Sequence, residues 1–259
     1  MTASEEEEPE ASVIPTSEPS FAAEAEEPPF PAWLRPLDRF FPAVVTLFTT
    51  VTLYWVMSRA AMTAGRSPFS LVFGLYVVLG AVTVFRLKAR GELSHLRPRG
   101  GDLTFGALVT LLLYGSTYVF HVLVTAPGQP RYEWVLQLYL RLGNPFAEDR
   151  HWVALFAAAI GALEELTWRG GVTAALEERL GLGMGNLLGV ALYASAHVAT
   201  MWALSGAQGL NPVLLLASAG CGAVWSYLRF RSDQQLAPVL FSHALFTWSV
   251  VEFPLFGRG

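Results

Sequence analysis

The chain has 259 residues, of which 53% are hydrophobic and only 15% are charged, and its mean hydropathy is positive. Soluble domains carry about 25% charged residues, so this composition predicts a polytopic membrane protein. The single cysteine, Cys221, excludes a disulfide framework within one chain. The formal net charge of −4 comes from glutamates crowded into residues 1–27. Since no basic patch with interleaved aromatic residues is present, we expect no nucleic-acid partner.

The first 30 residues differ in composition from the rest of the chain. They are rich in Glu, Pro, Ala and Ser and contain few large apolar side chains. Such a segment cannot bury enough apolar surface to offset the entropy of ordering, so residues 1–30 are predicted to form a disordered acidic tail. Residues 31–259 are predicted to form a transmembrane helical domain.

Seven apolar stretches follow the tail, each about as long as a membrane-crossing helix requires. The expected fold is therefore all-α, a bundle of about seven transmembrane helices. An additional amphipathic and aromatic segment, 132–142, lies between prolines and is predicted to form a short interfacial helix. If that segment crosses the bilayer, the number becomes eight. The seven stretches are approximately 40–57, 69–85, 103–124, 152–176, 187–204, 213–230 and 237–253.

The loop after the second stretch is strongly basic, which predicts its side of the membrane. Cytoplasmic loops of membrane proteins are enriched in Lys and Arg. This loop is therefore expected in the cytoplasm, together with the N-terminus. The bias toward Ala, Gly and Arg is compatible with a bacterial protein of the inner (plasma) membrane. The five cations of the loop are Arg86, Lys88, Arg90, Arg97 and Arg99.

The fourth stretch carries Glu164, Glu165 and Arg169 near its middle. A charged side chain at the centre of a bilayer costs roughly 2.5–3.5 kcal/mol on insertion scales, so these residues require partners. Glu165 and Arg169 are spaced i,i+4 and are predicted to pair on one helix face. Glu164 lies about 100° around the helix from Glu165 and needs a partner from another helix.

Two later stretches each carry one histidine at membrane depth, His197 and His243. A carboxylate that can take a proton from water, beside imidazoles that titrate near neutrality, is suited to hydrolysis. Two histidines and a glutamate could also hold a zinc ion and leave a position for water. Both forms of catalysis are compatible with these residue types.

These residues fall into three short patterns that occur in order on successive apolar stretches. Glu164 to Arg169 resembles an EExxxR motif, Tyr193 to His197 an FxxxH motif, and His243 to Thr247 an HxxxN motif. Together they resemble the motifs of the CPBP family, the intramembrane endopeptidases that include CAAX proteases and bacteriocin-processing enzymes. The resemblance covers about residues 150–253, which we therefore expect to form the protease core.

The resemblance implies a division of roles among these residues. Glu164 would act as the general base that activates water, with assistance from His197, while His243 and Thr247 would stabilise the oxyanion. Tyr193 and Thr247 stand where the family usually has Phe and Asn. The resemblance favours metal-free glutamic catalysis, so no metal or cofactor is expected, with zinc as the alternative. The supporting residues would be Glu165, Arg169 and Tyr193.

The expected partners are a membrane-associated protein or peptide substrate and the lipid bilayer, and the sequence does not define the oligomeric state. Two other functions remain open. The first is a non-catalytic membrane scaffold or immunity-type family member, which is favoured if Thr247 cannot replace the amide. The second is a proton-coupled transporter, which the absence of an inverted repeat in the sequence disfavours.

Overall fold

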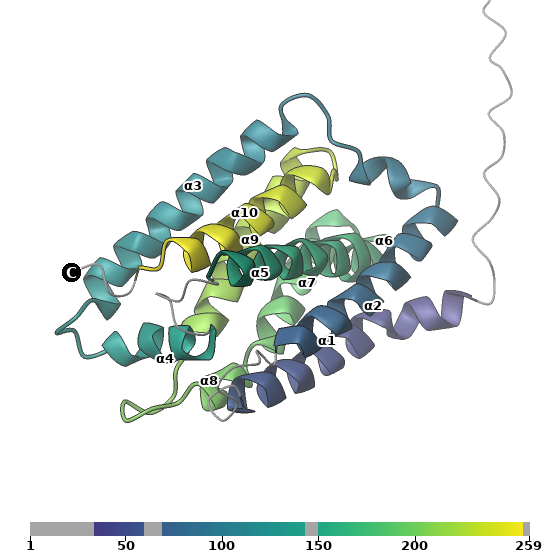
Figure 1. The fold of residues 1–259 in the computed structure, drawn as a ribbon. Coiled ribbons are helices and arrows are strands. Elements are labelled where there is room, and N and C mark those ends of the chain that lie inside the picture. The colour runs from purple at the N-terminus through teal and green to yellow at the C-terminus, as the bar shows by residue number, and fades with distance from the viewer. Residues whose placement is uncertain (1–33, 60–68, 143–149, 256–259) are drawn as a thin grey trace, which may run out of the picture.

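The computed structural model describes residues 34–59, 69–142 and 150–255, and within these ranges the chain is built from helices (Figure 1). The predicted acidic tail, residues 1–30, lies outside the described residues. In chain order the elements are α1 (Leu34–Arg59), α2 (Phe69–Ala89), the 3₁₀ helix η1 (Glu92–Leu96), α3 (Asp102–Phe120), the π-helix η2 (His121–Thr125), α4 (Tyr132–Leu142), α5 (Arg150–Glu165), the π-helix η3 (Leu166–Thr173), α6 (Ala174–Leu180), α7 (Leu182–Ala196), α8 (Thr200–Ala203), α9 (Val213–Arg231) and α10 (Ala237–Glu252).

In the described part of the chain, five helical segments are long and apolar enough to cross a membrane: 39–58, 70–89, 102–125, 182–203 and 213–231. Their outer surfaces expose large apolar side chains such as Leu47, Leu111 and Leu123, each more than 60% exposed. Apolar surface of this extent is typical of helices that face lipid. The all-α, polytopic membrane fold predicted from composition agrees with these findings.

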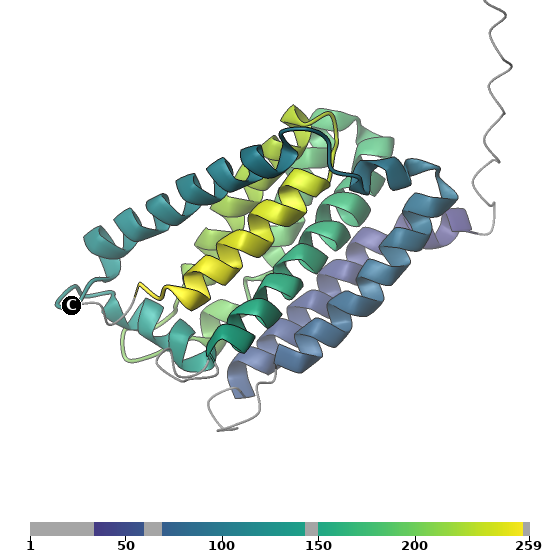
Figure 2. The ribbon, with the colours of Figure 1, turned by 45° about the horizontal axis from the view of Figure 1, so that its top comes forward.

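The other two predicted crossings, 152–176 and 237–253, also form helices, but they fall outside this group. α10 has 16 residues, and the segment from α5 to α6 carries charged side chains and is interrupted by a π-helix. Both lie between α3 and α2 in the bundle (Figure 2). Figure 2 shows α3, α10, α5 and α2 side by side, with α9, α7 and α1 behind them.

Small residues allow the inner helices to approach closely. A Cβ atom added at Gly161 of α5 would lie 3.0 Å from both His243 Cδ2 and Thr247 Oγ1 of α10. At Gly222 of α9 an added Cβ would lie 2.9 Å from Tyr193 Cδ1. α5 therefore packs against α10, and α9 against α7, at glycines, as is common between helices in membranes.

The basic loop predicted to be cytoplasmic lies at one end of the bundle. There Arg90, just after α2, contacts α6, and α6 contacts α9 and α1, while η1 contacts the residue before α10. The contacts are Arg90 Nη2 to Glu178 Oε2 at 2.8 Å, Arg229 Nη1 to Glu177 Oε2 at 2.8 Å, Arg179 Nη1 to the Arg39 carbonyl at 3.1 Å and Leu236 N to the His95 carbonyl at 2.8 Å.

The predicted short helix at 132–142 is confirmed as α4, which lies across the opposite end of the bundle (Figure 1). The Tyr139 hydroxyl donates to the Val250 carbonyl at 2.9 Å and accepts from Leu255 N at 3.2 Å. Asn211 Nδ2 donates to the Trp134 carbonyl at 2.9 Å. These bonds fix α4 to the end of α10 and to the loop before α9.

The predicted bounds of the fifth stretch differ from the structure at both ends. Gly181, with φ of 79°, makes the turn after α6, and α7 begins at Leu182 rather than at about residue 187. Gly185 packs α7 against α6, because a Cβ there would lie 2.5 Å from Glu177 Cα. The predicted continuous helix to residue 204 is interrupted after Ala196, so His197 lies at a helix end.

Candidate active site

The acid pair lies where the regular α-helix of the fourth stretch changes to a π-helix. α5 ends at Glu165, and every residue of η3 is buried. Glu164 is 8% exposed and Glu165 is fully buried. A π-helix holds an extra residue per turn and rotates the side chains that follow it, and such segments are frequent at functional sites.

Arg169 neutralises Glu165 and connects three helices. Its Nη1 donates to Glu165 Oε1 at 3.0 Å, so the i,i+4 pairing predicted from the sequence is confirmed. Nη2 donates to the Gly222 carbonyl at 2.7 Å, and Nε donates to Ser226 Oγ at 3.4 Å. The guanidinium also lies 4.6 Å from the centre of the Tyr193 ring. Arg169 therefore ties η3 to α7 and α9.

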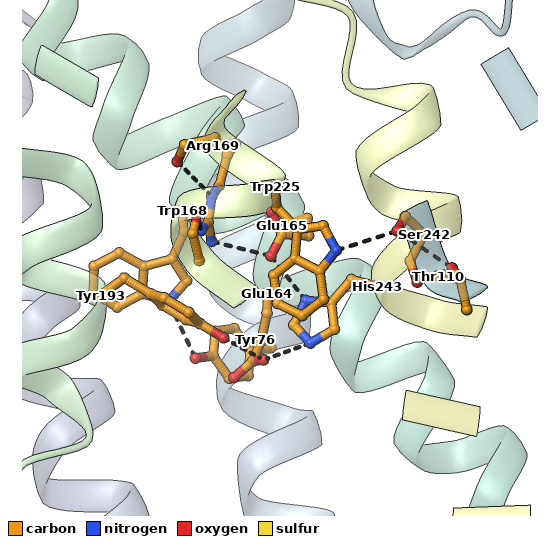
Figure 3. Close-up of polar contacts among 12 residues, drawn as sticks. Tyr76, Thr110, Glu164, Glu165, Trp168, Arg169, Tyr193, Trp225, Ser242 and His243 are labelled. Carbon is orange, nitrogen blue, oxygen red and sulfur yellow. Dashed lines mark hydrogen bonds and ion pairs between the residues drawn. The ribbon is translucent and has the colours of Figure 1, made fainter. Parts of the chain in front are cut away.

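His243 of α10 lies between the two acids (Figure 3). Its Nδ1 is 2.8 Å from Glu165 Oε1, and its Nε2 is 3.6 Å from Glu164 Oε2. Because an ionised carboxylate can only accept hydrogen bonds, Nδ1 carries a hydrogen that it donates to Glu165. Nε2 is then the nitrogen that faces Glu164, at a separation longer than a direct hydrogen bond.

Two tyrosines border Glu164. The Tyr193 hydroxyl donates to Glu164 Oε2 at 3.4 Å. The Tyr76 hydroxyl of α2 lies beside the same carboxylate and accepts a hydrogen bond from Trp168 Nε1 at 3.2 Å. Sequence analysis missed Tyr76, which is fully buried within an apolar helix. The signal that could have identified it is its hydroxyl, because a buried tyrosine usually has a hydrogen-bond partner.

His197 and Thr247 complete the set of residues singled out by the motifs. His197 Nδ1 donates to the Tyr193 carbonyl at 2.9 Å, which leaves Nε2 as the nitrogen that can accept a proton. Thr247 lies one turn after His243 on α10 and packs against Gly161. Both side chains line the same cavity as Glu164 and His243.

This cavity has a volume of about 610 Å³ and extends from the acid pair toward α4. Its walls are mostly apolar, with polar groups concentrated around Glu164, which is typical of a ligand-binding pocket. His121 is buried and also lines this cavity, with Nδ1 3.1 Å from Thr125 Oγ1. The apolar walls include Leu53, Val72, Leu138, Phe156, Ile160 and Phe246.

Sequence analysis also missed three residues that surround His243 from other helices. The indole of Trp225 stacks on the His243 ring with centroids 3.7 Å apart. Trp225 Nε1 donates to Ser242 Oγ at 3.2 Å, and Thr110 Oγ1 donates to the Ser242 carbonyl at 3.0 Å. Spacing along one chain carries no signal for such contacts between separate helices.

The arrangement does not fit a metal centre. In the part of the chain that the structure describes, no group of three or more His, Cys, Asp or Glu side chains is placed to hold a metal ion. Metal independence stays a prediction.

Fold and site together define a polytopic α-helical membrane protein with a buried carboxylate and imidazole facing each other in an apolar cavity. Residues 146–249 match the family model described as type II CAAX prenyl endopeptidase Rce1-like. The resemblance to the CPBP family predicted from the three motifs is therefore confirmed over residues 146–249, and the matched family is one of peptidases. A match to this family implies an intramembrane protease. Neither the curated proteins nor the solved structures contain a match to the chain.

Proposed function

We propose that this protein is an intramembrane endopeptidase that hydrolyses a peptide bond of a membrane-associated protein or peptide. Glu164 acts as the general base that activates water, and His197 assists it. His243 and Thr247 stabilise the oxyanion. Glu165, Arg169 and Tyr193 hold these groups in place.

One observation carries the proposal: Glu164 Oε2 and His243 Nε2 face each other at 3.6 Å inside an apolar cavity. A buried carboxylate without a full ion pair is costly in a membrane, so its retention favours a functional role. Arg169 is committed to Glu165, Gly222 and Ser226. Glu164 is therefore the acid available for chemistry.

The reaction begins with a water molecule hydrogen-bonded to Glu164. Its oxygen attacks the peptide carbonyl carbon while one of its protons passes to the Glu164 carboxylate. The carbonyl π-electrons move to the oxygen and form a tetrahedral oxyanion. When the C–N bond breaks, the protonated Glu164 supplies its proton to the leaving amine. The products are a carboxylic acid and an amine, and Glu164 returns to its ionised form.

Stabilisation of the oxyanion requires hydrogen-bond donors that are already in place. Because His243 Nδ1 donates to Glu165, the ring can also donate from Nε2 to the oxyanion only as an imidazolium. The hydroxyl of Thr247, one turn further along α10, supplies a second donor. Nε2 of His197 can accept a hydrogen bond from the attacking water.

The same proposal includes an orientation. We take seven crossings with the N-terminus in the cytoplasm, because the basic end of α2 contacts α6, which in turn contacts the basic end of α9. For a bacterial protein the membrane would be the inner (plasma) membrane. The apolar cavity walls favour a substrate segment that is itself apolar.

The test compares protein termini in membranes of cells that carry wild type, Glu164→Gln or Glu178→Gln. Glu178 is an exposed acid paired with Arg90 and serves as the matched control. We expect a set of new termini in wild type and Glu178→Gln that Glu164→Gln abolishes. Identical termini in all three strains would contradict proteolysis and support the scaffold function.

A further inference from the structure

His243 needs a fixed ring orientation for the proposed chemistry. Its two nitrogens point to different acids, with Nδ1 toward Glu165 and Nε2 toward Glu164. Glu165 constrains one edge of the imidazole, but a single hydrogen bond leaves the ring able to tilt about it. The orientation of Nε2 toward the reacting atoms therefore requires a contact on the face of the ring.

Trp225 of α9 provides that contact. The indole and imidazole planes are inclined by 19° with ring centroids 3.7 Å apart, and Trp225 is 2% exposed (Figure 3). An aromatic face this close attracts a cation as well as a neutral ring, so the stack stabilises the imidazolium in particular. It does so in a buried site, where such attraction is strongest.

Trp225 is itself held by residues of two other helices. Its Nε1 donates to Ser242 Oγ at 3.2 Å. Thr110 of α3 donates to the Ser242 carbonyl at 3.0 Å and lies 3.3 Å from Ser242 Oγ. Ser242 precedes His243 on α10 and is fully buried, so the same helix turn carries the imidazole and the acceptor that anchors the indole.

We infer that Trp225 is a positioning residue that orients the His243 imidazole toward the reacting atoms and favours its protonated form. Ser242 and Thr110 anchor the indole. α3 lies outside residues 146–249, so the site depends on a part of the chain that the family match does not cover. The inference deepens the proposed function and rests on it for its catalytic consequence.

The test uses Trp225→Leu, which removes the aromatic face, and Trp225→Phe, which keeps a face but loses the N–H donor. The control is Trp202→Leu, because Trp202 is 55% exposed and lies outside the cavity lining. The probe is an internally quenched peptide that spans a cleavage site found in the termini comparison. We expect Trp225→Leu to lower kcat about tenfold with KM within twofold of wild type.

The pH profile separates positioning from general damage. Activity that needs an imidazolium falls as pH rises, so Trp225→Leu should move the alkaline limb of the kcat profile to lower pH. Four other ionisable residues surround the His243 ring and are unchanged in the variant: Glu164, Glu165, Arg169 and His197. Trp225→Phe should leave the alkaline limb of the kcat profile at its wild-type pH. The inference would be overturned if Trp225→Leu left both kcat and the alkaline limb of its pH profile unchanged, or if Trp225→Leu and Trp225→Phe changed them equally.

A spectroscopic readout keeps this test separate from the proposed function. In ¹⁵N-histidine-labelled protein, the His243 signals are assigned by their loss in His243→Ala. Trp225→Leu should move these signals toward the neutral form at a fixed pH, and Trp202→Leu should leave them in place. If Glu164→Gln retains proteolysis, the proposed mechanism fails, whereas the ring signals still decide the role of Trp225. Unmoved signals in Trp225→Leu would overturn it.

Discussion

Loss of Arg169 from its ion pair with Glu165 should destabilise the protein unusually strongly for the loss of one charged residue. Both side chains are almost completely buried, at 0% and 1% exposure. Glu165 Oε2 has no hydrogen-bond partner among the described residues, so the charge of Glu165 is compensated through Oε1 by Arg169 and His243. Replacing Arg169 with Met removes most of that compensation and leaves a carboxylate in an apolar interior.

Breaking a buried ion pair by removing one partner typically costs about 3–5 kcal/mol, and we expect Arg169→Met to fall in this range. The matched control is Arg99→Met. Arg99 lies 3.9 Å from Asp233, and both side chains are exposed, so its loss should cost about 0–1 kcal/mol. The double variant Glu165→Gln with Arg169→Met should be more stable than Arg169→Met alone, because it leaves no uncompensated charge.

The measurement is reversible unfolding in mixed micelles with increasing SDS, followed by tryptophan fluorescence. It gives the free energy of unfolding for wild type, both single variants and the double variant. If Arg169→Met costs no more than Arg99→Met, or if the double variant is less stable than Arg169→Met, the assignment of Arg169 as the compensating charge is refuted.

Three further predictions follow from the geometry. If the Thr247 hydroxyl is an oxyanion donor, Thr247→Ala should lower kcat by a factor of about 10²–10³, and Asn at the same position should support at least part of the wild-type rate. Both variants are measured with the quenched peptide, and a fully active Thr247→Ala would contradict this role. Gly161→Ala should reduce activity at least tenfold, because the new Cβ displaces His243 and Thr247. The control Gly74→Ala places its Cβ in open space and should be neutral or slightly stabilising. Equal activities of the two variants would disprove the close approach of α5 to α10 at Gly161. Burial raises the pKa of Tyr139 to about 12, so its hydroxyl contributes fully to stability below pH 10 and this contribution is lost as pH rises through 12. In unfolding experiments Tyr139→Phe should lower the free energy of unfolding by about 1–2 kcal/mol, equally at pH 6 and pH 9. A loss that differed between these two pH values would contradict this assignment.

The sequence predicted those features that depend on residues close together in the chain. Composition alone indicated a helical membrane protein, and the i,i+4 spacing of Glu165 and Arg169 predicted their ion pair. The short helix at 132–142 followed from its amphipathic pattern and its flanking prolines. Each of these depends on local periodicity, which a single sequence contains.

Features that depend on contacts between helices were harder to predict. The family resemblance assigned Glu165 a supporting role without naming its contact, and the structure places Glu165 Oε1 2.8 Å from His243 Nδ1. The π-helix that begins at Leu166 changes the rotation of the following side chains, and regular helical spacing does not anticipate it. Tyr76 and Trp225 lie in apolar stretches outside the three motifs, and only the packed bundle brings them to the site.

The central claim is that Glu164 activates water for peptide hydrolysis inside the bilayer. The most direct measurement is cleavage of the quenched peptide by purified protein in liposomes, with wild type, Glu164→Gln and Glu178→Gln compared at equal amounts of folded protein. We predict cleavage by wild type and Glu178→Gln at similar rates and a loss of at least 10³-fold in Glu164→Gln. Cleavage by Glu164→Gln at the wild-type rate would contradict the claim.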